Sequence, residues 1–492
     1  MIISYDKIKK YKNLSSSQLE AFNFKNKNIF KLSQLLYRNL QTGDNGIEVG
    51  SINYIKKSEK IFMKAKALQA YNYLPVINAE TSEFIKPNCF VNMELLAGDI
   101  ILSKDSNIGE TCILDKDYSN VMLSNALYKL PIKKNKLYIF SFMKSSYFKK
   151  QLDILSPRGA TIRHAGKRFL DCYIPFPNST EVINFIECLT KSIIDIEKNI
   201  YIKNDKILNY FDNNLKDNCI IKKNCITALH FSEVKNIGRL DVGIFSESYK
   251  KINYYIENYR YGYRNLEELG YEISRGQNLQ ISNIGKSIYT KNKINEDYYQ
   301  LILSNSITDY MSFRTEEYLG SKKKLKEIEY GDIIFTCRGN LGRCFINCSE
   351  SKKMITNIDN VHISNKSSSI EEKITIGCYL HYLKHNNYLK NISIQGSGAD
   401  SFTKYHFDMI KVPNFPVDFQ KDIYDIYCSK IRTDFDINNI SSSLSELGLF
   451  QLEKAKEIIK KYIDFIFSKI VNDEFVNIER IFLDLKNELI LL

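Results

Sequence analysis

The chain repeats one of its own segments. Residues 98–109 recur as residues 331–342, and both copies begin with Gly-Asp-Ile-Ile and end with Asn, Ile or Leu, and Gly. A period of this length indicates a duplicated domain, because solenoid repeats are only about 20–50 residues long. The sequence therefore predicts one module present twice. Three shorter matches flank the main one in the same order: 39–41 with 278–280, 159–160 with 398–399, and 174–175 with 412–413.

Length and charge narrow the class of protein. At 492 residues the chain suits about three domains, and its formal net charge of +12 suits an anionic partner such as nucleic acid. The chain is also rich in Lys, Ile, Asn and Tyr, which AT-rich coding can produce without selection for binding. Charge alone leaves both explanations open.

Cysteine usage and hydropathy indicate a compartment. The eleven cysteines form no C-x-x-C pair, which favours free thiols in a reducing environment. The first residues show no secretory signal, and no apolar run approaches the roughly 18 residues that a membrane span needs. We expect a cytoplasmic protein.

Two regions carry the spacing of long helices. After the capping residues 178–180, apolar side chains follow at steps of three and four, which predicts a helix of roughly nine turns with one coiled-coil-like seam. An ordinary core-facing helix shows the same spacing over shorter stretches. The seam residues are Ile186, Leu189, Ile193, Ile196, Ile200, Ile207 and Tyr210.

The second repeat also ends in helical patterns. Asp418 caps an amphipathic stretch that runs to about Tyr427, and the three serines at 441–443 predict a break. Two further stripes follow: Leu452, Ala455, Ile459, Tyr462 and Ile466, then Phe475, Ile478, Phe482, Leu485 and Leu489.

Each repeat itself is predicted to be a mixed α/β (α+β) unit with a twisted, largely antiparallel sheet. Short apolar runs after Gly98 and Gly331 read as strands that end in polar loops, and residues 138–143 and 378–383 look helical. The predicted plan is a first domain at 1–177, a helical region at 178–225, a second domain at 226–416 and a helical region at 417–492.

Several motifs resemble one known family. Residues 239–242 (Arg-Leu-Asp-Val) are close to an R-L-D-A opening, which in the first half is reduced to residues 19–22. The Gly-Asp-Ile-Ile run, the Gly-Ala element with its proline-containing exit, and Gln420 with Ile423 in a Q-x-x-I pattern follow in order. Together they resemble the specificity subunit of type I restriction-modification systems.

The resemblance implies a non-catalytic reader of double-stranded DNA. Each target-recognition domain would contact one half of a split target, and the helices would set the unread gap between the halves. The chain would recruit two adenine-methylating subunits, which bring S-adenosylmethionine, and restriction and translocase subunits, which bring ATP and magnesium. The chain itself would bind none of these cofactors.

Arginine placement is the main clue to base contacts. The repeat up to Pro177 has only four arginines, all beside the duplicated motifs, and the guanidinium fork suits guanine O6 and N7. Structural ion pairs are the alternative, and for Asn107 and Asn340 a turn role is the stronger interpretation because Asn and Gly accept positive φ. The runs at 133–134 and 322–324 could contact phosphates or simply face solvent.

The full set of candidate DNA-binding residues follows the repeats. In the first half they are Arg38, Gln41, Lys104, Ser106, Asn107, Arg158, Thr161, Arg163, His164, Lys167 and Arg168. In the second half they are Arg275, Gln277, Asn278, Arg338, Asn340, Arg343, Ser401 and Lys404. Candidate contacts with partner subunits on the helices are Ile186, Ile193, Ile200, Leu452, Ile459 and Ile466.

Other functions have weaker support. His381 and His385 have a metal-like spacing but lack a third ligand. A methyltransferase or fused restriction enzyme would carry an adjacent proline pair or a glycine-rich nucleotide loop, and neither is present. A helical adaptor that does not read DNA remains a second alternative.

Overall fold

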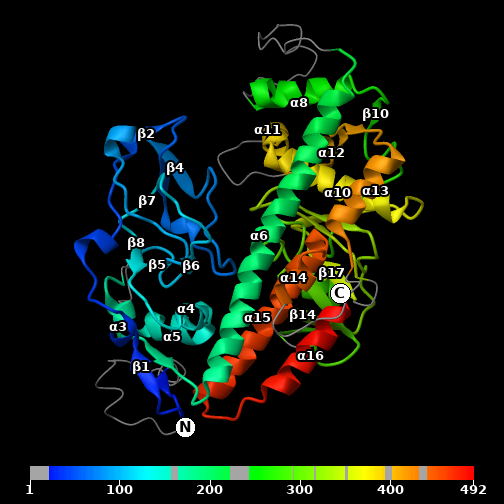
Figure 1. Ribbon diagram of the computed structural model, residues 1–492. Helices are drawn as coiled ribbons and strands as arrows, with labels where there is room; N and C mark the ends of the chain where they lie inside the picture. The colour runs from blue at the N-terminus through cyan, green and yellow to red at the C-terminus, as the bar shows by residue number, and fades with distance from the viewer. Residues whose placement is uncertain are drawn as a thin grey trace. The chain divides into compact units, whose positions relative to one another are not determined.

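The computed structural model describes residues 22–156, 165–221, 243–291, 293–314, 317–349, 353–393, 402–430 and 440–492. The described chain forms two compact units (Figure 1). The first unit takes its residues from Met1–Lys198, Arg432–Ser445 and Ala455–Leu492, and the second from Asn199–Ile431 and Glu446–Lys454. Both units are mixed α and β, as predicted.

The first unit is built from short strands in three sheets. A two-stranded antiparallel sheet joins β1 (Ile29–Lys31) to β9 (Tyr173–Pro175). The other two have the orders β2-β4-β3-β7 and β6-β5-β8. Their bounds are β2 (Tyr54–Ile55), β3 (Ile61–Met63), β4 (Ser82–Ile85), β5 (Ile100–Ser103), β6 (Thr111–Ile113), β7 (Val121–Leu123) and β8 (Leu127–Leu130).

The second unit repeats this plan. Its sheets have the orders β10-β19, β12-β14-β13-β17 and β11-β18-β15-β16. The bounds are β10 (Tyr263–Arg264), β11 (Glu272–Arg275), β12 (Ser287–Thr290), β13 (Tyr298–Ile302), β14 (Tyr318–Ser321), β15 (Ile333–Thr336), β16 (Cys344–Ile346), β17 (Met354–Thr356), β18 (Asn360–Ser364) and β19 (Val412–Pro413).

Topology and register confirm the duplication. The sheets β2-β4-β3-β7 and β12-β14-β13-β17 each contain one parallel pair, β3 with β7 and β13 with β17. Their other pairs are antiparallel. Ile100 lies opposite Ile113 in the first unit, and Ile333 lies opposite Ile346 in the second. The sheets are thus largely antiparallel, as predicted.

One of the flanking matches is wrong. The Gly46 N–H donates to Leu127 O, and the Gly276 N–H donates to Asn360 O, so these two glycines are equivalent. Residues 39–41 precede Gly46, whereas residues 278–280 follow Gly276, and the two triplets therefore occupy different places. The match of 174–175 with 412–413 is confirmed, because each pair lies in the strand that pairs with the first described strand of its unit, β1 or β10. Residues 159–160 and 398–399 lie outside the described residues.

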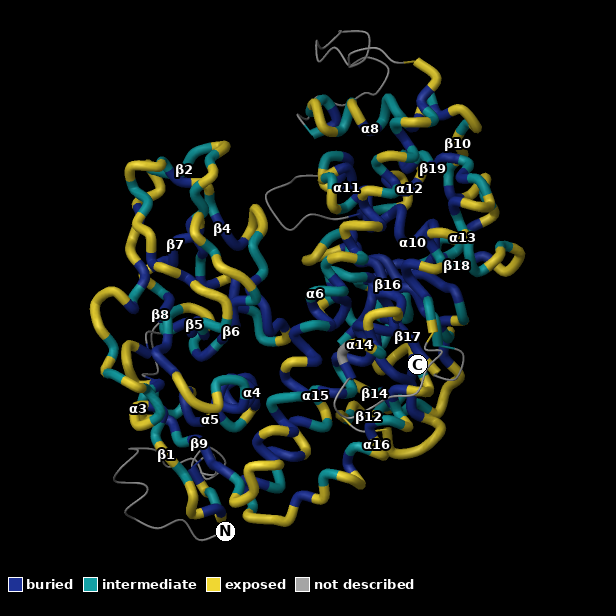
Figure 2. The backbone as a smooth tube through the Cα atoms, in the orientation of Figure 1, coloured by how far each residue is buried: buried dark blue, intermediate teal, exposed yellow. Residues whose placement is uncertain are grey.

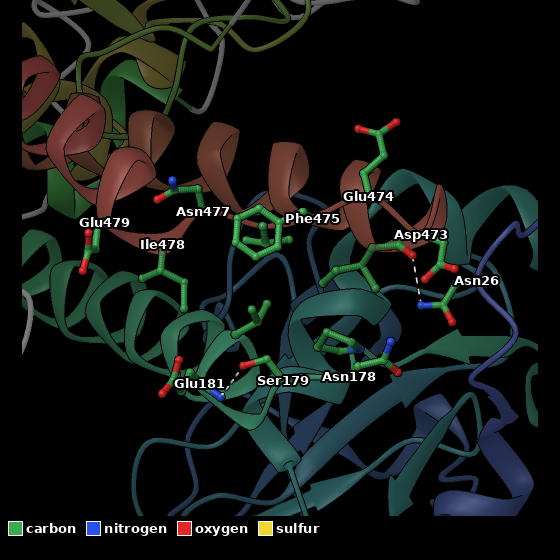
Figure 3. Close-up of a pocket in the computed structure, with 14 residues that line it drawn as sticks. Asn26, Asn178, Ser179, Glu181, Asp473, Glu474, Phe475, Asn477, Ile478 and Glu479 are labelled. Carbon is green, nitrogen blue, oxygen red and sulfur yellow. Dashed lines mark hydrogen bonds between the residues drawn. The ribbon is translucent and has the colours of Figure 1, made fainter.

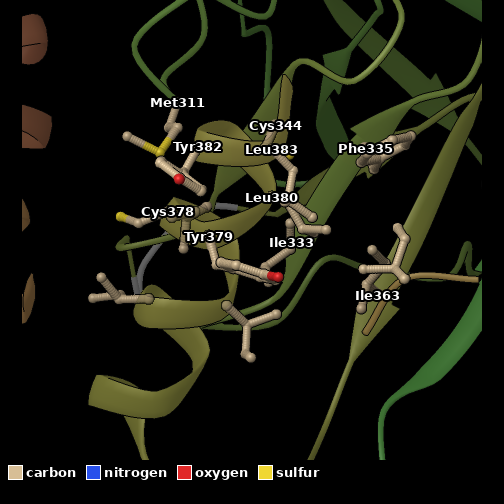
Figure 4. Close-up of a cluster of buried hydrophobic side chains, with 14 of the residues drawn as sticks. Met311, Ile333, Phe335, Cys344, Ile363, Cys378, Tyr379, Leu380, Tyr382 and Leu383 are labelled. Atoms are coloured by element: carbon tan, nitrogen blue, oxygen red, sulfur yellow. The ribbon is translucent and has the colours of Figure 1, made fainter. Parts of the chain in front are cut away.

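Helices cover the sheets where the apolar pattern placed them. Residues 138–143 lie in α4 (Lys136–Lys144) and residues 378–383 lie in α10 (Ile370–His385), which confirms both predictions. Figure 4 shows Leu380 and Leu383 of α10 beside Ile333 of the sheet, in the buried cluster that also contains Phe335 and Ile363. The remaining short helices are α3 (Leu32–Leu35), α5 (Ser146–Leu155), α8 (Glu247–Glu257), α9 (Ile281–Ile284), α11 (Tyr388–Ile392), α12 (Lys404–Asp408) and α13 (Val417–Tyr427).

The long helices extend the predicted seams. Helix α6 (Thr180–Asp217) has 38 residues and contributes to both units, and α15 (Leu449–Val471) also contributes to both. Within the first unit the two helices run antiparallel, since Glu197 pairs with Lys456 while Val182 and Ile470 line one pocket. In the described residues, no helix is both long and apolar enough to cross a membrane.

Two predictions for the C-terminal helices are wrong: the break at residues 441–443 and the place of Phe475 in the last apolar stripe. The serines at 441–443 lie within α14 (Ile440–Leu444), whose Ile440 and Leu444 are buried one turn apart and give that turn an apolar face. Phe475 lies before α16 (Ile478–Ile490) and is 83% exposed, while the buried stripe of α16 is Ile481, Leu485 and Leu489.

The prediction that six helix residues contact partner subunits is also wrong, because all six side chains are buried. Their exposed fractions are 0–1%, because they form apolar seams inside the chain. In this conformation a partner would meet other faces of the helices. The residues are Ile186, Ile193, Ile459 and Ile466 in the first unit, and Ile200 and Leu452 in the second.

Candidate nucleic-acid interface

Each unit presents one loop on the same backbone frame. In the first unit, residues 104–110 join β5 to β6; we call the first four of them, 104–107, loop A. The Gly109 N–H donates to Ser103 O (2.8 Å) and the Lys104 N–H donates to Ala126 O (2.9 Å). The Ala165 N–H donates to Lys104 O (2.9 Å). Main-chain bonds thus hold loop A against two other segments.

Residues 337–343 join β15 to β16 in the second unit; we call the first four of them, 337–340, loop B. The Gly342 N–H donates to Thr336 O (3.0 Å), and the Cys337 N–H donates to Asp359 O (3.2 Å). The Phe402 N–H donates to Cys337 O (3.1 Å). Every bond has its counterpart around loop A. The strands beneath are buried, as Figure 2 shows in dark blue near the β16 label.

Glycine is required two residues after each loop. Gly109 and Gly342 both have φ +80°, where L side chains are strained. A Cβ would lie 2.8 Å from a Leu152 methyl at Gly109 and 2.9 Å from a Leu389 methyl at Gly342. Within the loops, positive φ occurs at Ser106 and Gly339. The asparagines do not adopt it, although the Asn107 carbonyl does close the turn by accepting the Glu110 N–H.

The loops differ most in charge. Asp105 of loop A occupies the place of Arg338 in loop B. The Asp105 side chain is 18% exposed and lies 4.0 Å from the Lys104 ammonium, whereas the Arg338 side chain is 64% exposed and its nearest recorded carboxylate, Asp359, is 3.8 Å away. The same frame therefore presents a compact ion pair in one unit and a projecting guanidinium in the other.

Other predicted residues gather around loop B. Arg275 donates weakly to Ile358 O (3.4 Å) and Phe402 O (3.3 Å), which places it beside the segments that hold the loop. Lys404 follows Phe402 and pairs with Glu267 at 2.8 Å, and this hydrogen bond raises the pKa of Lys404. Gln277 forms a β-bridge with Asn357, in the segment that holds the loop, and its side chain accepts the Lys326 N–H. The Asn278 side chain accepts the Gln280 N–H, and Asn340 is exposed within loop B itself.

Loop A has a matching rim. Lys167 and Arg168 are exposed and follow Ala165, which is bonded to the loop. Asn107 is exposed and its amide is 3.5 Å from Leu68 O, and Lys104 lies 5.2 Å from the Tyr128 ring centre. The exposed candidates here are Ser106, Asn107, Lys167 and Arg168.

Two of the predicted arginines already hold carboxylates. Both terminal guanidinium nitrogens of Arg38 donate to the Asp44 carboxylate, at 2.6 and 2.8 Å. The Gln41 backbone N–H donates to the same carboxylate. Burial opposes ionisation of Asp44, but these hydrogen bonds hold its pKa below the usual value. Arg343 likewise grips Asp309, at 2.8 and 2.7 Å. Their guanidinium forks are occupied, which favours the structural interpretation for both.

Five candidates lie outside the described residues: Arg158, Thr161, Arg163, His164 and Ser401. The same holds for residues 239–242 of the family-like opening. The lysine runs at 133–134 and 322–324 are exposed, consistent with either interpretation.

The segment beneath each loop was missed by sequence reasoning. Residues 124–126 and 357–359 hold the two loops and stand 233 positions apart, the offset of the main repeat. They contribute Asn125, which accepts from the Asn45 amide at 2.6 Å, and Asp359 beside Arg338. The offset of the main repeat pairs these segments, but their residues differ at all three positions, so the sequence carries no signal of the contact.

His381 serves the core of the second unit. Its Nε2 lies 2.8 Å from Asn204 Oδ1, and burial lowers its pKa to about 3. Among the described residues, no cluster of three or more His, Cys, Asp or Glu side chains could hold a metal.

A pocket in the first unit has the wrong charge for DNA. It lies between the start of α6 and the turn from α15 to α16, around Phe475 and Ile478 (Figure 3). Four of its lining residues are carboxylates, which would repel phosphates: Glu181, Asp473, Glu474 and Glu479. The loop rims are therefore the better candidates for a nucleic-acid interface.

Comparisons with known proteins give structural neighbours. No protein-family model matches the sequence. No curated protein matches it either. Solved structures of type I restriction-modification S subunits do match the chain over most of its length.

Three such structures illustrate the likeness. A chain from a study of the assembly and conformational transition of a type I R-M system is 11% identical, covers 91% of this chain and 98% of its own, and has a TM-score of 0.29. The HsdS subunit from Thermoanaerobacter tengcongensis is 12% identical, covers 91% of this chain and 97% of its own, and has a TM-score of 0.27. The S subunit from M. genitalium is 12% identical, covers 95% of this chain and 98% of its own, and has a TM-score of 0.35. Values this low transfer no residue role to this chain.

Proposed function

We propose that this chain is the DNA-reading specificity subunit of a type I restriction-modification complex. One observation carries the proposal: the same backbone frame occurs twice and presents loops of different charge, with Asp105 in one and Arg338 in the other. Two modules on one chain bind a duplex as a single ligand, and they favour sites whose spacing fits both. Different loops on equal frames suit two different half-targets.

The chain would read and recruit without catalysing. An adenine methyltransferase subunit would bring S-adenosylmethionine, and restriction subunits would bring ATP and magnesium. Because the apolar seams of the long helices are buried, their exposed faces would form the docking surface.

Genome-wide mapping of methylated adenines tests the proposal. The chain is co-expressed with the methyltransferase encoded beside it, and a second strain carries loop A in place of loop B. We expect a bipartite motif in the first strain and a change in one half only in the second. Methylation without a bipartite motif would contradict the reading role, and a helical adaptor would give binding to partners with no sequence preference.

A further inference from the structure

Residues 68–74 of the first unit, which we call the bracket, lie between helix α6 and the β5–β6 hairpin. Leu68, Tyr73 and Leu74 are buried, with exposed fractions of 0–2%. The Tyr73 carbonyl accepts the Ile113 N–H of β6 at 2.8 Å. The bracket therefore touches the hairpin that carries loop A.

A buried carboxylate ties the bracket to α6. Both Glu197 oxygens accept the Tyr73 N–H at 2.9 Å, and one accepts the Leu74 N–H at 2.8 Å. Lys456 of α15 pairs with the same carboxylate at 2.5 Å, and the two side chains are only 1% and 6% exposed. Hydrogen bonds to a charged group are stronger than neutral ones, and a buried charge in an apolar seam favours one helix register.

A buried ammonium ties the bracket to the hairpin. Lys144 donates to Gln69 O (2.8 Å), Asn72 O (2.8 Å) and Thr111 O of β6 (3.0 Å). The Lys144 side chain is 1% exposed. Burial lowers the pKa of Lys144 to about 7. The connection from α6 to loop A thus passes through the buried Glu197 carboxylate and the buried Lys144 side chain, with the bracket between them.

In the second unit, the residue that bonds to the equivalent strand β16 is held by different side chains. Met311 takes the place of Tyr73, because its carbonyl accepts the Ile346 N–H of β16. That carbonyl also accepts the Tyr427 hydroxyl of α13 at 2.8 Å. Nearby, Glu453 of α15 pairs with Arg314. The carboxylate clamp on two backbone N–H groups is a feature of the first unit.

We propose that Glu197 and Lys144 are positioning residues that fix the direction in which loop A is presented from helix α6. The inference rests on the proposed function: in a reader of split targets, this direction decides which gap between half-targets is accepted. Loosening the bracket broadens the accepted gap and leaves the bases read by loop A unchanged.

The test is the gap distribution in methylated sites of strains that carry variant chains with the methyltransferase. Glu197→Leu with Lys456→Leu replaces the ion pair by apolar side chains, which preserves burial but removes the acceptor for Tyr73 and Leu74. Lys144→Met releases the hairpin side alone. For both variants, the preference for the native gap over gaps one base pair longer or shorter should fall at least about tenfold, as for a lost charge-assisted hydrogen bond.

Leu485→Ala is the matched control, since Leu485 is buried in α16 of the same unit. It should lower the melting temperature and total methylation while keeping the gap sharp. Backbone hydrogen exchange at Tyr73 and Leu74 should speed up in the Glu197 variant and not in the control. Folded variants with an unchanged gap distribution would overturn the positioning role, and a wild-type motif that is not bipartite would overturn the proposed function itself.

Discussion

At the residue scale, exposure separates the arginines that could read bases from those that serve the fold. Arg338 projects from loop B with a 64% exposed side chain, while Arg38 and Arg343 have their guanidinium forks on Asp44 and Asp309. A bidentate base contact needs a free fork. Of these three, Arg338 comes nearest to this condition, because its contact with Asp359 is 3.8 Å long, which is beyond hydrogen-bond distance.

Arg338→Ala should weaken binding to the specific DNA target by about 1–3 kcal/mol, because a bidentate contact with guanine would be lost. Fluorescence anisotropy on target and scrambled duplexes measures both affinities. Lys322→Ala, in the exposed lysine run, is the control and should reduce both equally. An equal loss on both duplexes for Arg338→Ala would identify it as a phosphate ligand instead.

Asp44 should make stability depend on pH. Its carboxylate is held by Arg38 and has a lowered pKa in the folded chain. The stabilisation is therefore fully present above the unfolded pKa of about 3.9 and is lost as pH falls through the lower folded value. The difference in melting temperature between wild type and Asp44→Asn should shrink below about pH 4. A constant difference from pH 3 to 7 would contradict the assignment.

At the element scale, the two hairpins depend on glycines that no side chain can replace without strain. Gly342→Ala should lower the free energy of unfolding by at least about 1 kcal/mol, since φ is positive and the new methyl meets Leu389. Denaturant titration measures the change. Gly43→Ala, where a Cβ meets nothing within 4 Å and φ is not positive, should be close to neutral. An equal loss of unfolding free energy in the two variants would show that neither the positive φ nor the contact with Leu389 matters for stability.

The sequence predicted these elements where a pattern was local. The apolar runs after Gly98 and Gly331, the seam of α6 and the helix that ends at Tyr427 were all found, because period and punctuation are visible in a short window. The prediction that Asp418 caps this last helix was wrong, since Pro416 is the N-cap and Asp418 lies in the first turn. The hydrogen bonds between Glu197 and Tyr73 join residues 124 positions apart, and the ion pair of Arg38 with Asp44 depends on the folded geometry rather than on sequence spacing. A single sequence carries no pattern that predicts either interaction.

Register across the duplication was the harder part. The Asn-Leu-Gln triplets matched in letters but not in place, because the equivalent glycines Gly46 and Gly276 are 230 positions apart, whereas the triplets are 239 positions apart. Both glycines allow close approach to a backbone carbonyl, at which a Cβ would lie 1.9 or 2.1 Å from oxygen. Such close contacts are visible only in the folded chain.

At the scale of the whole molecule, α6 contributes residues to both units as one continuous helix. Deleting one heptad, residues 199–205, would shorten it by about 10 Å. The accepted gap between half-targets should then shorten, as methylome mapping can show, provided circular dichroism reports a folded chain. Deleting a single residue, which rotates the seam away from its partner, should unfold the helix instead. An unchanged gap in a folded heptad variant would refute the role of α6 as a spacer.

Main-chain bonds seat the two loops, so the exposed Arg338 and Asn340 of loop B can change identity at little cost to folding. Because Cys337 is buried in the core and Gly339 has positive φ, a library randomised at positions 338 and 340 should yield mostly well-expressed proteins. Selection from such a library could retune one half of the recognised site while the other half stays as it is.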